Sequence, residues 1–256
     1  MRPYVIITRP AVQANIFARL LTAIECPYEL FPLMEIQPLT DSRELDSSLM
    51  SLAEFCLVAF VSPNAVDAVF SKITHWPSQV AIAVMGAGSR AALAEHGITE
   101  ANTLIISPVN PDKTDSETLL EVLDVNALRS GKVLIIRGET GRELLADALR
   151  ALSISVTQVA AYRRCAPELT EQKKQQLIRL LSRNNDWVVT SSEVLGTMLS
   201  FAGQIELEDG VVKMQHQHLI VPHVRIAETA KKLGFQSITQ TGSGDEHLLV
   251  ALQSHL

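Results

Sequence analysis

Short apolar runs alternate with amphipathic stretches of helical length along the chain. The stretch YVIIT near the amino terminus is one such run, and the residues after it repeat apolar positions at helical spacing. Continuous apolar runs are typical of buried parallel strands, and the stretches between them are typical of helices that cover such a sheet. The runs that we interpret as strands lie near 4–8, 28–32, 56–61, 80–85, 103–106, 132–137, 155–161, 186–190, 218–221 and 237–240.

Ten strands are many for one open sheet in a chain of 256 residues, because open sheets usually hold about four to six strands. We therefore expect two sheets of about five strands each, with helices on their faces. This organisation predicts two α/β domains.

Landmarks of the first half recur in the second half at a nearly constant offset. One late pair, Gly97 with Gly234, has a larger offset. The second half therefore carries extra residues, which we place in the loop before His216. The agreement favours an internal duplication, although convergent strand–helix patterning also produces part of it. The matching pairs are Arg9 with Arg137, Pro38 with Pro167, Ser62 with Ser191 and Leu119 with Leu248, at an offset of 128 or 129 residues.

Each half consists of a strand–helix–strand piece, an extended exit bordered by proline, and a longer piece of alternating strands and helices. Proline at the border of the exit disfavours a helix and suits an extended connection. Two assemblies fit this order: each half folds as its own domain, or the exits cross over and each domain mixes pieces of both halves. The periodicity does not choose between them.

Composition excludes several classes of protein. The chain is 47% hydrophobic, so it can bury a sizeable core, but it has neither a run long enough to cross a bilayer nor the apolar core of a signal peptide. Its net charge of −6 argues against a nucleic-acid partner. Three cysteines without metal-binding spacing suit a reducing compartment. We expect a cytoplasmic protein without a membrane partner.

Small and hydroxyl residues repeatedly follow the predicted strands and begin the next helix. Exposed amides at such a position, together with the positive end of the helix dipole, bind carboxylate or phosphate. The alternative is that the serines only cap helices. Because these residues gather at one edge of each predicted sheet, we prefer anion binding as an additional role. The candidates are Ser62, Gly86, Ser89, Gly138, Thr190 and Ser191.

Arg9 and Arg137 stand where two buried strands end, in YVIITRP and KVLIIRG. An arginine held at a strand end beside a helix amino terminus is placed to bind a carboxylate with both arms of its guanidinium. The structural alternative is an ion pair with the acidic first turn of a neighbouring helix. Both interpretations stay open for each arginine.

Other motifs give little support for cofactors or metals. The stretch from Gly86 to Gly88 lacks the third glycine of a dinucleotide site, and no phosphate-binding loop motif occurs, so we expect no nucleotide cofactor. His216 and His218, with His223 nearby, lack a familiar zinc spacing, and we interpret them as solvated histidines of an inserted loop. GxSxG is absent as well.

Tyr162 lies in VAAYRRC, the second of the two exits. A tyrosine in such a place usually packs against its neighbours and keeps its hydroxyl in water. A tyrosine that faces a ligand can instead donate a proton to a leaving group.

These landmarks together resemble the uroporphyrinogen-III synthase family. The resemblance runs through ITRP, FVSPNAV, VMGAGSRAALAEHGI, LIIRGETGRELLADALRALSISVTQVAAYRRC, VVTSSEVL, RIAETAKKLGF and TGSGDEHLLVAL. Each piece alone is unspecific, and their order and spacing carry the resemblance.

The resemblance implies two flavodoxin-like parallel-sheet domains joined by a two-stranded extended linker, in the crossed arrangement. Its domain boundaries are a first domain of 1–35 plus 168–256, a second of 38–160, and linker strands at 34–38 and 161–167. It further implies a cyclising lyase that converts hydroxymethylbilane, a linear tetrapyrrole, to uroporphyrinogen III with loss of water and inversion of the last ring, without cofactor or metal. We expect a monomer.

The resemblance also gives roles to residues. Tyr162 matches the tyrosine that is the family's usual candidate for the proton donor, and the helix starts and arginines would hold the carboxylates of the substrate. This chain departs from the family at His223, which follows Pro222 where many relatives have a hydroxyl side chain, and at Ser89, where threonine is common. A two-domain binding or sensor protein that closes on a small anion without catalysis is the alternative, because this architecture serves many functions.

Overall fold

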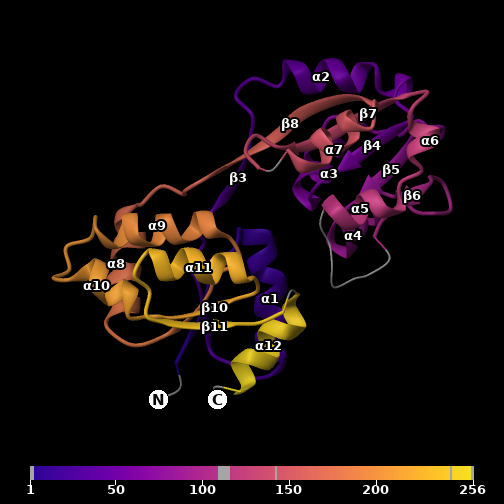
Figure 1. Cartoon of the computed structure of the whole chain (residues 1–256). Coiled ribbons are helices and arrows are strands. Elements are labelled where there is room, and N and C mark those ends of the chain that lie inside the picture. The colour runs from indigo at the N-terminus through magenta and orange to yellow at the C-terminus, as the bar shows by residue number, and fades with distance from the viewer. Residues whose placement is uncertain (1–2, 109–115, 142, 243, 255–256) are drawn as a thin grey trace. The chain divides into compact units, whose positions relative to one another are not determined.

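The computed structural model describes residues 3–108, 116–141, 143–242 and 244–254. The chain divides into two compact units: unit 1 comprises Met1–Glu35 and Cys165–Leu256, and unit 2 comprises Ile36–Arg164. Residues 1–2 and 255–256 of the predicted first domain, and Ser243 of the TGSGD motif, lie outside the described residues. Figure 1 shows the two units with most of their elements labelled.

Unit 1 is built on a parallel five-stranded sheet in the order β2-β1-β9-β10-β11. One of its faces packs against α8 to α11 around Trp187, and the other against α1 and α12 around Phe17. The strands are β1 (Val5–Ile7), β2 (Tyr28–Leu30), β9 (Asp186–Val188), β10 (His218–Val221) and β11 (Ser237–Gln240). The helices are α1 (Ala11–Ala23), α8 (Glu171–Leu181), α9 (Ser192–Ala202), α10 (Gly210–Gln215), α11 (Val224–Lys232) and α12 (Asp245–Ser254).

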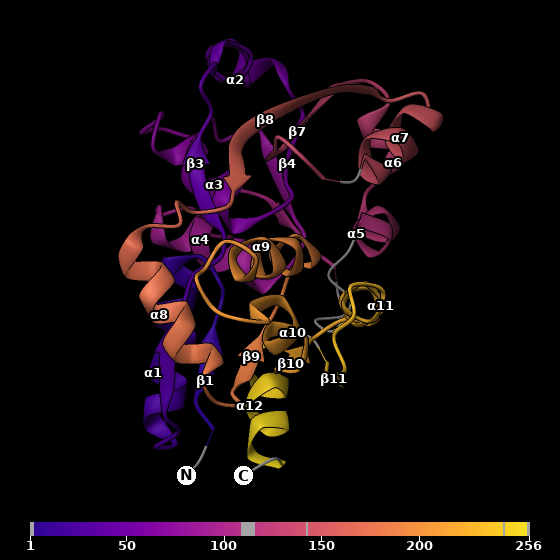
Figure 2. The same ribbon diagram turned by 90° about the vertical axis from the view of Figure 1, so that its left-hand side faces the viewer.

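Unit 2 contains the sheet β3-β8-β7-β4-β5-β6, in which β4 to β8 are parallel. Helices α3 and α4 cover one face and α5 to α7 the other, and Figure 2 shows these layers on opposite sides of the strands. The strands are β3 (Glu35–Pro38), β4 (Leu57–Phe60), β5 (Ala81–Val84), β6 (Ile105–Ile106), β7 (Lys132–Gly138) and β8 (Ser155–Cys165). The helices are α2 (Arg43–Met50), a 3-10 turn at Leu52–Glu54, α3 (Pro63–Phe70), α4 (Ala87–Glu95), α5 (Ser116–Val122), α6 (Val125–Leu128) and α7 (Leu144–Ala151).

The predicted fold class is confirmed. All ten predicted strands are present, and the two exits pair with each other as β3 and the end of β8. In unit 1 the sheet joins the first strands of the first half, β1 and β2, to the last strands of the second half. In unit 2 it joins β7 and β8 of the second half to β4, β5 and β6 of the first.

The extra residues of the second half were placed wrongly in a loop. They form helix α10, Gly210–Gln215, which packs its buried Met214 into the core of unit 1. A short amphipathic segment gains its helical structure from such tertiary packing more than from its own propensity. Among the described residues, no helix combines the length and the apolar character that a membrane crossing requires.

Candidate active site

Ser62 begins helix α3 at the carboxyl end of β4. Its backbone is extended, and its Oγ accepts a hydrogen bond from the N–H of Ala65 at 3.2 Å. Ser191 begins α9 in unit 1 in the same way and accepts from the N–H of Glu193 at 3.3 Å. Both caps follow from local sequence, because a serine before a helical stretch satisfies amides that have no partner within the helix.

The amino-terminal turn of α4 lies against that of α3. Gly86 is the N-cap residue of α4, and Ser89 is buried in its first turn. A Cβ added to Gly88 would lie 3.4 Å from the Cγ of Pro63, so the glycine permits this close packing. The tertiary structure therefore brings Ser62, Gly86 and Ser89 to one region at the carboxyl edge of the sheet in unit 2.

Tyr162 is the centre of the closest contacts at this edge. Its Oη lies 3.0 Å from the Oγ of Ser62, and either hydroxyl can be the donor. Its ring lies on Gly138, where an added Cβ would come within 3.0 Å of the ring Cζ. The backbone carbonyl of Tyr162 accepts a hydrogen bond from the N–H of Glu139 at 2.8 Å. The side chain is only 6% exposed, so its position is well defined.

A shift in strand register turns Tyr162 to the face that carries Ser62. Arg137 pairs with Ala160, but the next residue of β7, Gly138, pairs with Tyr162, so Ala161 is an extra residue in β8. Regular alternation would put Tyr162 on the opposite face from Ala161. With the extra residue, both side chains belong to the apolar cluster that packs against α3. Such bulges redirect side chains near functional sites.

Arg137 is a buried cation at the same edge. Its side chain is 8% exposed, with Nη1 at 3.6 Å from Glu143 Oε1, and its Nε donates to the carbonyl of Gly138 at 3.1 Å. Gly141 has a φ of 150°, and a Cβ there would lie 2.9 Å from the Nη2 of Arg137. Glycine at that position therefore leaves room for the guanidinium.

Arg9 in unit 1 forms the ion pair that was one of its two predicted roles. Its Nη1 lies 2.6 Å from the Oδ1 of Asp245, in the first turn of α12. Its guanidinium also stacks over the ring of Phe17 at 5.1 Å from the ring centroid, a favourable cation–π distance. These contacts hold the arginine at the carboxyl end of β1, and they are compatible with a ligand contact from its other donors.

Thr190 and His223 complete the candidates of unit 1. Thr190 directly precedes the capping Ser191, and both are partly exposed. His223 is the exposed N-cap residue of α11, and its side chain makes no capping hydrogen bond to that helix. The four candidates of unit 1 thus follow β1, β9 and β10, three neighbours in its sheet.

Our interpretation of His218 as a solvated loop histidine was wrong. His218 begins β10, and its Nδ1 lies 2.6 Å from Asp186 while its Nε2 lies 2.9 Å from Thr239 Oγ1. Asp186 is the register partner of His218 on β9, a relation between strands that residue spacing did not reveal. In the part of the chain that the structure describes, no three His, Cys, Asp or Glu side chains group closely enough to hold a metal ion.

Sequence reasoning also missed the partners of two arginines. Asp245 and Glu143 were not named as partners. The sequence suggested only that an acidic residue at the start of a neighbouring helix would pair with each arginine. Arg164, two residues after Tyr162, was missed as well, and its Nη2 donates to the carbonyl of Thr140 at 2.9 Å. Its place two residues after the tyrosine in YRRC is the signal that would have found it.

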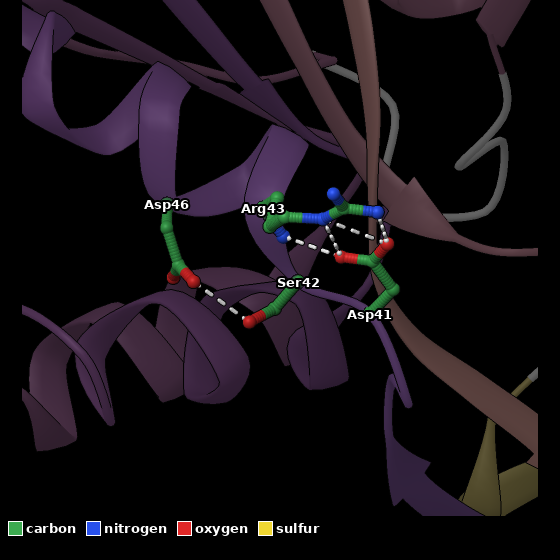
Figure 3. A network of polar contacts seen from close by, with 4 residues as sticks. All are labelled: Asp41, Ser42, Arg43 and Asp46. Atoms are coloured by element: carbon green, nitrogen blue, oxygen red, sulfur yellow. Dashed lines mark hydrogen bonds and ion pairs between the residues drawn. The ribbon is translucent and has the colours of Figure 1, made fainter.

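A separate groove of about 860 Å³ lies in unit 2 between α2 and β8, and none of the ten predicted residues lines it. Its charged lining residues are Asp41, Arg43, Glu44 and Glu139. The Nε of Arg43 donates to Asp41 at 2.9 Å (Figure 3), and this hydrogen bond holds the pKa of Asp41 below its usual range. Three carboxylates around one paired guanidinium repel an anion, so this groove is a poor candidate for an anion site.

The sequence is similar to a known family over most of its length. A family model described as uroporphyrinogen-III synthase HemD matches residues 18–249. Uroporphyrinogen-III synthase of Escherichia coli (strain K12) is 31% identical over 97% of this chain and 99% of that protein. The enzyme of Salmonella typhimurium is 30% identical over the same shares of the two chains.

Two solved structures have the same fold. The structure of uroporphyrinogen-III synthetase from Helicobacter pylori 26695 superimposes with a TM-score of 0.63 at 15% identity, covering 99% of this chain and 100% of that one. A mutant uroporphyrinogen III synthase from Thermus thermophilus gives a TM-score of 0.56 at 14% identity over the whole of both chains. At these identities the likeness concerns the fold alone.

Proposed function

The chain belongs to the uroporphyrinogen-III synthase family, and on this premise we propose which of its residues carry out the family's reaction. The enzyme is a cofactor-independent, cyclising lyase of haem biosynthesis. It converts hydroxymethylbilane to uroporphyrinogen III with loss of water and inversion of the last pyrrole ring. The single observation that carries the assignment is the match over nearly the whole chain to synthases of similar length.

Tyr162 is the proton donor in this proposal. The electron-rich pyrrole drives departure of the substrate hydroxyl, so the protein needs to supply one proton and a defined geometry. The phenolic O–H gives its proton to the leaving hydroxyl, which departs as water. The phenolate then takes up the proton that the attacking ring carbon releases when the new carbon–carbon bond has formed. The support is that Tyr162 lies at the carboxyl edge of the sheet, held by Ser62 and Gly138.

The remaining candidates bind the carboxylate side chains of the substrate. In unit 2 this role falls to Arg137 and the starts of α3 and α4, and in unit 1 to Arg9, His223 and the start of α9. Arginines and helix amino termini are the groups that bind carboxylates best in proteins. Because these groups bind carboxylates at short range, the net charge of −6 of the whole chain does not prevent binding of an anionic substrate.

Product analysis tests the function directly. Purified protein incubated with freshly generated hydroxymethylbilane is expected to yield isomer III, because the protein selects one way of closing a folded tetrapyrrole. The products are separated by chromatography against a protein-free control. Isomer I alone would reject the function, and tight binding of the tetrapyrrole without turnover would favour a binding protein or sensor.

Replacing both Arg9 and Arg137 by alanine is expected to raise the apparent KM about tenfold, or about 1.4 kcal/mol. This is less than the sum for two hydrogen bonds between charged groups, at about 1.5–3 kcal/mol each, because both guanidiniums already share their donors with protein carboxylates. Steady-state kinetics and thermal melting are measured on the same preparation. The melting temperature is expected to fall only a little, whereas KM rises clearly.

Two carboxylate variants are the matched controls. Asp245→Asn and Glu143→Gln remove the partners of the ion pairs and keep both arginines. They are expected to leave KM near that of the wild type. If the arginine and the carboxylate variants all lower the melting temperature alike and leave KM unchanged, the arginines serve folding only.

We also propose that the enzyme works as a cytoplasmic monomer. The three cysteines form no disulfide, which suits a reducing compartment. Both sets of candidate residues come from a single chain, so the proposed chemistry requires no second subunit. Sedimentation at micromolar concentration measures the mass in solution.

A further inference from the structure

The hydroxyl of Ser62 contacts two groups, a backbone N–H and the hydroxyl of Tyr162. Its Oγ accepts from the N–H of Ala65, in the first turn of α3, and also lies 3.0 Å from the Oη of Tyr162. A serine hydroxyl has one hydrogen to donate, and so has a tyrosine hydroxyl. Only one of these two hydrogens lies between the oxygens, so the direction of the bond decides whether Tyr162 keeps its proton for another acceptor.

The electrostatics of the helix start select one direction. The amides of the first turn of α3 are the positive end of the helix dipole, so the oxygen lone pairs of Ser62 turn towards them. The hydroxyl hydrogen then points away from the helix, where the Oη of Tyr162 is its neighbour. In this arrangement Ser62 donates, Tyr162 accepts, and the phenolic hydrogen stays available.

The rest of the tyrosine is held so that this one bond decides the orientation of its hydroxyl. Gly138 lies under the ring, and a Cβ added to it would come within 3.0 to 3.2 Å of the Cζ, Cε2 and Oη of Tyr162. Glu139 donates its N–H to the tyrosine carbonyl, and the shifted register fixes the face of the strand. Because ring and backbone are fixed, rotation of the phenolic hydrogen is the freedom that remains.

We propose that Ser62 is a positioning residue, which donates its hydroxyl hydrogen to Tyr162 and thereby directs the phenolic hydrogen to the leaving hydroxyl of the substrate. This inference rests on the proposed role of Tyr162 as proton donor. It assigns the Ser62 side chain to Tyr162 and leaves carboxylate binding at the start of α3 to the backbone N–H groups of its first turn. Its helix-capping role is retained, because capping uses an oxygen lone pair and positioning uses the hydrogen.

Three substitutions separate capping from positioning. Ser62→Thr keeps the cap and the donor, and most of the turnover is expected to remain. Ser62→Ala loses both, and kcat is expected to fall about fivefold, the equivalent of one ordinary hydrogen bond. Ser62→Asp keeps the cap, but an ionised carboxylate only accepts, so it takes the phenolic hydrogen and kcat approaches that of Tyr162→Phe.

A double-mutant cycle shows whether Ser62 acts through Tyr162. In the Tyr162→Phe background, Ser62→Ala and Ser62→Asp are expected to cause no further loss of kcat. Equal losses with and without the tyrosine hydroxyl would overturn the inference, and so would a rise in KM in both backgrounds, which assigns Ser62 to substrate binding. Ser62→Asp with the turnover of Ser62→Thr would overturn it as well.

Thr170 supplies the control for a lost cap. Its hydroxyl caps α8 by accepting from the N–H of Lys173 at 3.3 Å. Thr170→Ala is expected to lower the melting temperature about as much as Ser62→Ala without changing kcat. The wild-type protein is assayed for isomer III in the same experiment: isomer I alone rejects the proposed function and the inference together, whereas isomer III with additive effects rejects the inference only.

Discussion

Tyr162→Phe lowers kcat by about 10²-fold, the lower range of what a positioned proton donor contributes, while isomer III remains the main product. The substitution keeps the ring, which packs on Gly138, and removes only the hydroxyl that lies 3.0 Å from Ser62 Oγ. The pyrrole still expels the leaving group, but slowly, because no acid assists it. Isomer control is expected to persist because it depends on how the substrate is held, and the substitution leaves the proposed carboxylate-binding groups unchanged.

The matched control is Tyr28→Phe. Tyr28 lies in β2 of unit 1, and its hydroxyl lies 3.5 Å from the Oγ1 of Thr22. Its loss is expected to leave kcat unchanged. Initial rates and product chromatography are measured for both variants. Wild-type kinetics for Tyr162→Phe would show that Tyr162 is a packing residue, and loss of isomer III would give its hydroxyl a part in holding the substrate.

Trp187→Ala is expected to destabilise unit 1 by about 3–5 kcal/mol, the usual cost of removing a buried large aromatic side chain. Trp187 is fully buried, meets Phe31 edge to face at 6.0 Å, and donates from Nε1 to Gln217 at 3.1 Å. Its cluster joins Ile6 and Phe31 from the first half of the chain to residues of the second half. A decrease of this size in the free energy of unfolding lowers the melting temperature of unit 1 by roughly 10 °C or more.

The two tryptophans make this experiment selective, because each unit contains one of them. In the Trp187→Ala variant only Trp76 fluoresces, and it reports on unit 2, whose midpoint is expected to stay unchanged. The reciprocal Trp76→Ala removes a 5% exposed side chain that packs on Phe60 at 5.8 Å. In that variant the fluorescence of Trp187 is expected to show a wild-type midpoint for unit 1. If either substitution shifts both midpoints alike, the two units unfold as one.

Calorimetry completes this test, since it detects both units regardless of fluorescence. Two transitions are expected, and each tryptophan variant is expected to move only one of them. The result bears on the proposed domain boundaries, because unit 1 combines 1–35 with the carboxyl-terminal part of the chain. If each half of the chain were a domain, Trp187→Ala would not affect the packing of β1 and β2.

Local sequence was sufficient for the strands and for the serine caps, although not for helix α10. Continuous apolar runs such as KVLIIRG form buried strands in any parallel sheet, and all ten were found. Serines before helical stretches cap helices through amides two or three residues away, as Ser62 and Ser191 do. These features depend on neighbours in the chain, so the sequence contains what decides them.

Side-chain partners were predicted less well, because they come from distant parts of the chain. For Arg9 the pattern left a ligand contact and an ion pair open, and the partner, Asp245, is at the other end of the sequence. His218 was misinterpreted because Asp186 and Thr239 reach it only through the pairing of β9, β10 and β11. Family resemblance, and not periodicity, indicated which strands would share a sheet.

The sequence by itself thus determined the alternation of strands and helices and the serine caps of α3 and α9. Only the tertiary structure decided that Tyr162 meets Ser62. Alternation along β8 turns even-numbered side chains such as Val156 to the other face, and the extra residue Ala161 returns Tyr162 to the face of α3. The physical reason is that a strand's register is set by hydrogen bonds to its neighbour, and one inserted residue reverses the face of every side chain after it.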